Sequence, residues 1–242
     1  MNRRNVWFVL LVAGMAGIFS PSYGAPDFSH IKSVAIIAGL GDELTISSMG
    51  GTRFSRNEVK AGIADWSIDD LISRRAAELL QPRFAVVPFA YERAKVLSFF
   101  GSGPNPMGLS DVIGSFPNRP DVDAFIVLTK LSRNNWPWIA QNLNGLALSR
   151  SATLGAPEWF RAHALYAISV FDARSFQQLD WQAAKSSDRY PLPWPVTKAE
   201  ASLWPADGRT LTPAQREQIK AVMVALLDDS LYESFRRIGL IE

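Results

Sequence analysis

Residues 124–128 (Ala-Phe-Ile-Val-Leu) constrain the fold of this chain more than any other feature of its sequence. An extended segment points its side chains alternately to two faces, and here both faces are apolar, which is typical of a central strand buried on both sides. The chain can build such a core, because 48% of its 242 residues are apolar and 20% are charged. These proportions exclude a chain that is disordered throughout, and the length suits one domain or two small ones.

Other short runs also have the patterns of strands. The first is apolar and ends at glycines 39 and 41, the second alternates in a way that predicts one exposed face, and Pro88 favours an edge position for the fourth. Asp172 lies in the turn between the last two, which together predict a hairpin. The predicted strands lie at residues 33–38, 44–47, 52–54, 84–89, 163–171 and 179–184.

A helix is predicted to begin at Ile68. Ser67 precedes it as an N-cap, Asp70 follows three residues later as in a capping box, and Pro82 ends it. A second, short helix is predicted at residues 92–99. The apolar stripe predicted for the first helix comprises Ile68, Leu71, Ile72, Leu79 and Leu80.

The last helix has clear signals at both ends. Thr212 is its expected N-cap, Pro213 its first residue and Gln215 the capping-box partner, and Gly239 ends it. Apolar residues recur at helical spacing from Ile219 onwards, and this stripe is too long to leave in water. We expect this helix to pack along the sheet as part of the core, with the acids beside the stripe at Asp228, Asp229 and Glu233.

The order of these elements predicts one mixed α/β (α+β) domain over residues 25–242. A mixed sheet would be covered by a helix from the amino-terminal half of the chain and by the long carboxyl-terminal helix. Three segments without a clean period are expected to form irregular loops, near residues 101–120, 132–160 and 185–211.

The amino terminus predicts an export signal. Arg3 and Arg4 precede fourteen uncharged residues, 6–19, which are too few to span a membrane. Small residues follow, and we place signal-peptidase cleavage after Gly24. The mature chain is then expected to be periplasmic or secreted, with no stable membrane anchor.

Charge and composition narrow the partners and cofactors. Removing residues 1–24 takes away two arginines and no acid, which leaves 23 basic and 23 acidic side chains. A neutral, exported chain argues against nucleic acid as a partner. The chain has no cysteine and two histidines, His30 and His163, so thiolate and multi-histidine metal sites are excluded and no cofactor or metal is expected.

Several short segments of the sequence resemble segments of known proteins. They are residues 34–37, the step from the first helix into residues 84–87, residues 122–127, and the hairpin at residues 168–181. In these phrases the chain is similar to the amino-terminal domain of the Tol–Pal translocation protein, the curli-secretion lipoprotein and the lipoprotein activators of peptidoglycan synthases. The resemblance implies an α/β fold and a binding role, and it carries over no active-site residue.

Two sets of residues are candidates for a functional site. Asp42 and Glu43 follow a buried strand and Asp123 precedes one, so their carboxylates would form an acid/base or cation site if the strand ends converge. Aromatic rings next to prolines suit a glycan ring or a partner surface. These aromatic candidates for ligand binding are Trp136, Trp138, Trp194 and Trp204.

The sequence therefore favours an exported, non-enzymatic binding or accessory protein of the bacterial cell envelope, with an envelope protein or a glycan as partner. The alternative is a carboxylate-dependent hydrolase with its site near Asp42, Glu43 and Asp123. His163, at the start of an apolar run, is expected to be a structural histidine.

Overall fold

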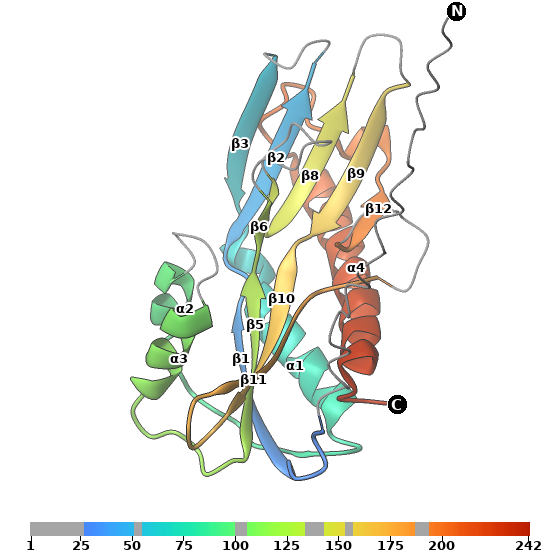
Figure 1. The fold of residues 1–242 in the computed structure, drawn as a ribbon. Helices are drawn as coiled ribbons and strands as arrows, with labels where there is room; N and C mark the ends of the chain where they lie inside the picture. The colour runs from blue at the N-terminus through green and yellow to red at the C-terminus, as the bar shows by residue number, and fades with distance from the viewer. Residues whose placement is uncertain (1–26, 51–54, 100–105, 134–142, 153–156, 187–193) are drawn as a thin grey trace, which may run out of the picture.

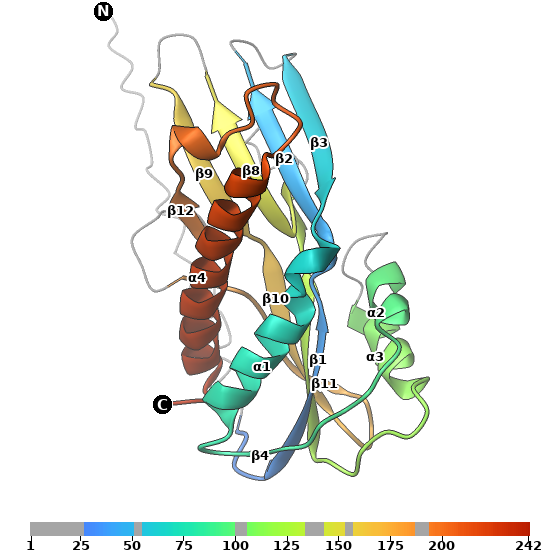
Figure 2. The ribbon, with the colours of Figure 1, turned by 180° about the vertical axis from the view of Figure 1, so that it is seen from behind.

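The computed structural model describes residues 27–50, 55–99, 106–133, 143–152, 157–186 and 194–242. The predicted signal peptide and residues 52–54 lie outside these ranges. Two five-stranded sheets lie end to end, and a long helix runs along both of them (Figures 1 and 2). One hydrophobic cluster contains residues from both sheets and from this helix, which confirms the prediction of a single mixed α/β domain.

The first sheet contains the strand that the sequence places at its centre. This strand, β5 (Ala124–Lys130), is buried from Ala124 to Thr129 and lies parallel to β1. On its other side it pairs antiparallel with β10, which forms the predicted hairpin with β11. The order of the strands is β11 (Gln178–Ala183), β10 (Tyr166–Asp172), β5, β1 (Ser33–Gly39) and β4 (Ala85–Val86).

The short strand β4 is shorter than the sequence predicts, but it lies at the edge of the first sheet, where Pro88 placed it. The turn of the β10–β11 hairpin is held by Asp172. Its Oδ1 accepts the backbone N–H groups of Arg174 and Ser175, at 3.0 and 2.7 Å. The two strands pair antiparallel with a register shift between Val170 and Phe171, which confirms the predicted hairpin.

The second sheet corrects the prediction made for β2. The exposed face expected for β2 is buried, because β2 is an interior strand between β3 and β8 and its alternate face carries Thr45 and Ser47, which are 2% and 0% exposed. Residues 52–54, where the sequence predicts the start of a third strand, lie outside the described residues; the strand β3 is described from Arg56, and its charged residues hide the strand pattern. The order is β12 (Val196–Lys198), β9 (Trp159–Ala164), β8 (Leu146–Ser151), β2 (Glu43–Met49) and β3 (Arg56–Gly62).

The chain crosses between the sheets at Leu165. Residues 163–171 therefore do not form one strand: β9 ends at Ala164 and β10 begins at Tyr166. Backbone hydrogen bonds of 2.9 Å link Leu165 to both Leu131 and Gly145 at this crossing, where a small ladder of β6 (Ser132–Arg133) and β7 (Leu143–Asn144) also lies. The pattern of apolar residues does not reveal this crossing, because the chain remains apolar on both sides of Leu165.

Helices cover both faces of the first sheet. Val34 and Ile36 of β1 point into the cluster that contains α1 (Ile68–Leu80) and α4 (Pro213–Ile238). Ala35 and Ile37 point the other way, into a cluster with α2 (Arg93–Phe99) and α3 (Pro106–Gly114). Figure 2 shows α1 and α4 side by side in front of the sheets, with α2 and α3 beyond them.

The ends of α4 are as the sequence predicts. Thr212 and Gln215 form a reciprocal capping box, and Gly239 ends the helix with a positive φ of 83°, a backbone conformation that suits glycine. The apolar stripe is buried, which confirms that α4 belongs to the core. Glu233 is a correction: it is buried within the stripe, and hydrogen bonds from Arg236 and then Arg237 lower its pKa.

The start of α1 differs from the prediction. Ser67 has a φ of 49° and its side chain caps nothing, so no capping box forms. The helix ends at Leu80, as the nearby proline predicts. Leu71 and Leu79 are half-buried at the edge of the stripe, because the buried apolar positions are four residues apart: Ile68, Ile72, Ala76 and Leu80.

The three segments expected to be irregular contain regular elements. α3 lies within residues 101–120, β8 within 132–160 and β12 within 185–211. Pro106 and Gly108 conceal the helix, and the alternate face of β8 carries small residues such as Ser149 instead of an apolar or charged pattern. Composition alone therefore misplaces these elements.

Candidate functional site

Asp42, the first candidate carboxylate, is held by Arg93 of α2. Its two oxygens accept hydrogen bonds from Nη1 and Nη2 of Arg93, both at 2.7 Å. Nε of Arg93 donates to Asp69 at 2.6 Å, and the other oxygen of Asp69 accepts the backbone N–H of Leu40 at 2.7 Å. The hydrogen bonds from Arg93 lower the pKa of Asp42, so this carboxylate is ionised and paired.

The other candidate carboxylates have partners other than Arg93. Glu43 forms an exposed ion pair with Lys60 at 3.0 Å. Asp123 accepts the backbone N–H groups of Lys32 and Ser33 at 2.8 and 2.9 Å, which lowers its pKa.

These contacts place Asp123 at the amino end of β1, whereas Asp42 follows its carboxyl end. The length of β1, about 20 Å at roughly 3.3 Å per residue, separates the two. Asp42 and Asp123 therefore lie at opposite ends of β1, and the condition for a shared acid/base or cation site, that the strand ends converge, is not met. The alternative of a carboxylate-dependent hydrolase has no common site for Asp42, Glu43 and Asp123.

His163 is buried in a cluster with Ser149 and Trp194. The indole N–H of Trp194 donates to Nδ1 of His163 at 3.1 Å, and Nε2 lies 2.6 Å from Oγ of Ser149. Burial lowers the pKa of His163 to about 3, so the ring is neutral and its single proton is on Nε2. Nε2 therefore donates to Ser149 and cannot take a proton from it, which excludes a serine–histidine nucleophile in this arrangement.

The two tryptophan candidates that the structure describes, Trp194 and Trp204, do not share a surface. Trp194 is 2% exposed and packs with Ala147, whereas Trp204 is half-buried and packs with the cluster that contains Leu148. Successive residues of a strand point to opposite faces, so the two rings lie on opposite sides of the second sheet. Trp136 and Trp138 lie outside the described residues, and ligand binding by these rings stays a prediction.

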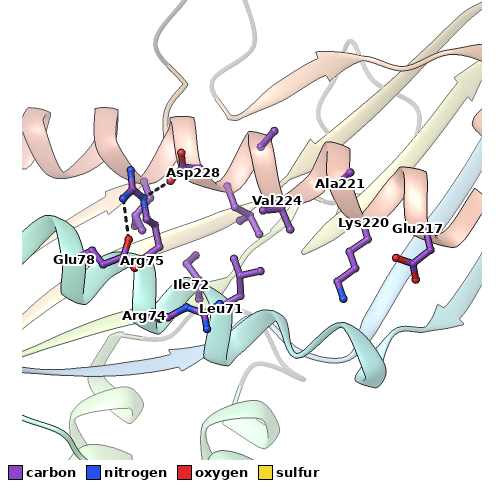
Figure 3. Close-up of a pocket in the computed structure, with 13 residues that line it drawn as sticks. Leu71, Ile72, Arg74, Arg75, Glu78, Glu217, Lys220, Ala221, Val224 and Asp228 are labelled. Atoms are coloured by element: carbon purple, nitrogen blue, oxygen red, sulfur yellow. Dashed lines mark hydrogen bonds and ion pairs between the residues drawn. The ribbon is translucent and has the colours of Figure 1, made fainter.

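The surface recess that the sequence does not predict lies between α1 and α4, and we call it the interhelix groove. It encloses about 610 Å³. Its floor is apolar: Leu71 and Ile72 come from α1, and Val224, Leu227 and Leu231 from α4. Figure 3 shows Leu71, Ile72 and Val224 pointing toward one another between the helices.

A second recess of about 680 Å³ continues the interhelix groove toward the carboxyl terminus. Glu78 lines both recesses. Leu79, Pro82 and Ile241 line the second, together with Tyr232, whose side chain is 47% exposed. Among the described residues, Tyr232 and Trp181 are the large hydrophobic side chains classed as exposed, so an aromatic ring is available to a partner here.

Charged residues form the walls of the groove. Arg75 of α1 donates to Glu78 at 2.9 Å and is also paired with Asp228 of α4. Among the described residues, Arg74, Lys220 and Glu217 have no hydrogen bond or ion pair through their side chains, and the hydrogen bond from Arg216, together with the charge of Lys220, lowers the pKa of Asp65. Figure 3 shows the Lys220 side chain extending from α4 toward α1.

The sequence contains only a weak signal for the groove. Exposed Ala221, Ala225 and Tyr232 lie on the polar side of α4, where charged residues are expected. Leu71 belongs to the predicted stripe of α1 and remains half-buried. Small or apolar residues at exposed positions identify unusual sites on each helix separately. They do not show that α1 and α4 pack against each other.

No protein-family model and no curated protein matches this chain. The solved structures to which it is similar include the following two. A hypothetical protein of Chlamydia trachomatis is 9% identical with a TM-score of 0.30, over 83% of this chain and 98% of that one. A lipoprotein of Neisseria meningitidis is 11% identical with a TM-score of 0.26, over 82% and 99%. Sequence identities and TM-scores this low assign the chain to no family. The resemblance to envelope assembly proteins stays a prediction.

Two further properties concern membranes and metals. No helix in the described part of the chain combines the length and the apolar content needed to cross a membrane. The same residues contain no cluster of three or more His, Asp or Glu side chains arranged to hold a metal ion.

Proposed function

We propose that this protein is an exported, non-enzymatic binding or accessory protein of the bacterial envelope, and that it binds a protein partner in the interhelix groove. The observation that carries the proposal is the groove itself. Half-buried Leu71 and Val224 lie at the surface between charged walls, above fully buried Ile72, Leu227 and Leu231. Tyr232 adds an exposed ring in the neighbouring recess. Contiguous apolar recesses rimmed by polar residues are characteristic of interaction sites.

The groove is built on the rigid part of the molecule. Ile72, Leu227 and Leu231, which form part of its floor, are also fully buried members of the main hydrophobic cluster. The capping box and Gly239 fix the two ends of α4. A surface held in this way loses little conformational freedom when a partner binds.

A protein segment suits the groove better than a glycan does. Glycan sites present flat aromatic rings, and among the described lining residues Tyr232 is the one aromatic side chain. The floor is otherwise aliphatic, and such surfaces pack against aliphatic and aromatic side chains of another protein. Nucleic acid is disfavoured by the equal numbers of acids and bases in residues 25–242.

Export rests on the amino-terminal pattern of Arg3, Arg4 and the apolar run that follows. We expect residues 1–24 to be removed and the mature chain to be released into the periplasm or secreted. Cell fractionation with mass spectrometry of the intact chain tests this part. A mature chain that begins at Ala25 supports export, and an unprocessed cytosolic chain contradicts it.

Site-specific photo-crosslinking tests the binding role. A photoreactive amino acid replaces Ala225 in the groove or, as a control, Ala214, another exposed alanine of α4 outside it. In exporting cells we expect a discrete protein adduct from position 225 and none from position 214. The adduct should disappear when Tyr232→Ala is added. Equal labelling from both positions would contradict a binding groove.

A further inference from the structure

We infer that β3, at the free edge of the second sheet, pairs antiparallel with β3 of a second copy of this chain. The pairing joins two five-stranded sheets into one continuous sheet, with a two-fold axis at Val59. No residue of β3 lines the interhelix groove, so this inference is independent of the proposed function. Three observations carry it: the length of the edge, the hydrogen-bonding groups that it leaves free, and the order of its charges.

The strand β3 is the longest and most regular edge strand of the two five-stranded sheets. At the other edges, β4 and β12 have two and three residues, and β11 has a register shift. β3 has seven residues, and all of them pair with β2 without a shift. Figures 1 and 2 show β3 at the outside of the second sheet. A strand edge of this length is a template for another strand.

The odd-numbered residues of β3 direct their backbone groups to β2. Ile63 donates its N–H to the carbonyl of Asp42 at 2.7 Å, just beyond one end of the ladder. Ser55 accepts the N–H of Gly50 at 2.8 Å, just beyond the other end. Alternate residues of an antiparallel strand bond to the same neighbour, so the even-numbered residues of β3 direct their backbone groups outward.

These outward groups are open to a partner. No described residue bonds the outward backbone groups of Arg56, Glu58 and Lys60. Gly62 also faces outward, with its carbonyl accepting Nη1 of Arg216 at 2.9 Å, and a Cβ built on this glycine would meet no atom within 4 Å. The edge therefore has the donors and acceptors of an unfinished ladder, with nothing described in front of them.

The order of the charges selects a second copy as the partner. An antiparallel pair with its axis at Val59 matches outward residues with outward residues, and it sets Glu58 opposite Lys60 of the partner subunit. The two-fold axis forms this ion pair twice. An axis at Glu58 or at Lys60 also matches outward residues, but it sets like charges opposite each other, which destabilises the pairing.

One other register sets unlike charges opposite each other. An axis at Asn57 places Glu58 opposite Arg56 of the partner subunit, but it matches fewer positions within β3. The axis at Val59 matches every outward position of the strand, from Arg56 to Gly62. The extent of the ladder therefore favours Val59.

Charges on an edge strand also keep foreign strands away. Within one copy, Glu58 pairs with Arg56 at 3.4 Å and Lys60 with Glu43 at 3.0 Å, both at the surface. Surface pairs of this kind add little stability, so they oppose the contacts between copies only weakly. The same charges that repel a wrongly aligned strand thus accept the strand of a second copy.

Disulfide trapping tests the register. The chain has no cysteine, so Val59→Cys introduces a single thiol. Opposite residues of a non-hydrogen-bonded antiparallel pair have Cα atoms roughly 4.5 Å apart, within the range of a disulfide. We expect the mature Val59→Cys protein to become a covalent dimer in a glutathione redox buffer. Asn57→Cys, on the same face of β3, is the matched control, because its two thiols would lie about 13 Å apart in this register.

Sedimentation of charge variants tests the complementarity. Glu58→Lys and Lys60→Glu each set like charges opposite each other, and each should raise the dissociation constant of the dimer at least about tenfold. The variant that combines both substitutions exchanges the two signs and should restore the dimer. Lys198→Glu reverses an exposed lysine at the other edge of the sheet and should change nothing. Circular dichroism and thermal unfolding show that all these variants remain folded.

The outcomes separate this inference from the proposed function. A mature protein that sediments as a monomer at every soluble concentration, with Val59→Cys left uncrosslinked, overturns the inference. Preferential crosslinking through Asn57→Cys overturns the register. A dimer that withstands both single charge reversals lies on another surface and also overturns it. Photo-crosslinks from position 225 test the interhelix groove separately from all of these results.

Discussion

Two arginines of this protein each bind two carboxylates, and their surroundings differ. Arg93 joins Asp42 to Asp69, whose side chain is 5% exposed and also accepts the backbone N–H of Leu40. Arg75 joins Glu78 to Asp228, which are both about half exposed. The first cluster holds three segments of the fold together, whereas the second lies in the wall of the interhelix groove, where water screens it. The same arrangement of one arginine and two carboxylates therefore stabilises the fold at Arg93, whereas at Arg75 it is exposed and contributes little to stability.

The largest effect is expected at Arg93. Arg93→Ala leaves the buried Asp69 carboxylate without its cation, and it should lower the free energy of unfolding by about 3 kcal/mol. This is near the low end of the range for a broken buried pair, because Arg93 itself is partly exposed. Urea unfolding followed by circular dichroism measures the loss. A loss below about 0.5 kcal/mol would place the two arginines in one class.

The pH dependence of stability sharpens the same contrast. The pKa of Asp42 is below its ordinary value of 3.8 in the folded protein, because Arg93 donates hydrogen bonds to it. The stability that this pairing adds is present above the unfolded pKa and is lost as the pH falls through the folded one. Between about pH 6 and pH 2.5 the urea midpoint should therefore fall more in the unsubstituted protein than in Arg93→Ala. Parallel curves would show that Asp42 does not depend on Arg93.

A smaller effect is expected at Arg75. Arg75→Ala removes two exposed ion pairs and should change the free energy of unfolding by less than about 1 kcal/mol. Arg209→Ala provides a control without an ion pair. The Arg75 effect should also fade in about 1 M salt, where screening is strong, and the Arg93 effect should persist. A salt-resistant loss above about 2 kcal/mol at Arg75 would mean that the groove wall is part of the core.

The smallest effect on stability is expected in the groove itself. Ala225→Trp adds a ring at an exposed position, so the free energy of unfolding should stay within about 0.5 kcal/mol of the unsubstituted value. Thermal unfolding of this variant beside Ala214→Trp checks the expectation. A large loss confined to Ala225→Trp would show that the wall of the groove is packed rather than open.

The parts of the fold that follow from the sequence are those set by local chemistry. The apolar run in β5, the Asp172 turn and the ends of α4 are each determined by residues a few positions apart. The break at Leu165 cannot be predicted from the sequence. The residues on both sides of it are apolar, and β9 and β10 are separate strands only because they pair within different sheets. Ser67 fails as a cap because its backbone takes a left-handed conformation that the preceding segment imposes.

The site was less predictable for a related reason. Arg75 and Asp228 are 153 residues apart in the sequence, and no local pattern shows that α1 and α4 lie side by side. For the candidate carboxylates the local signal was present but the distance was not predictable. Asp42 and Asp123 each lie next to a buried strand, yet they are at opposite ends of β1. Local patterns identify the elements of this fold, and the groove depends on how distant elements pair.

Methyl NMR of the folded mature protein tests the central claim most directly. Alanine and leucine methyl signals are recorded while the protein that crosslinks from position 225 is added in purified form. If the interhelix groove is the binding surface, the signals of Ala221, Ala225 and Leu71 should shift and saturate together, and that of Ala214 should stay in place. Saturating shifts confined to residues outside the groove, with Ala221 and Ala225 unchanged, would contradict it.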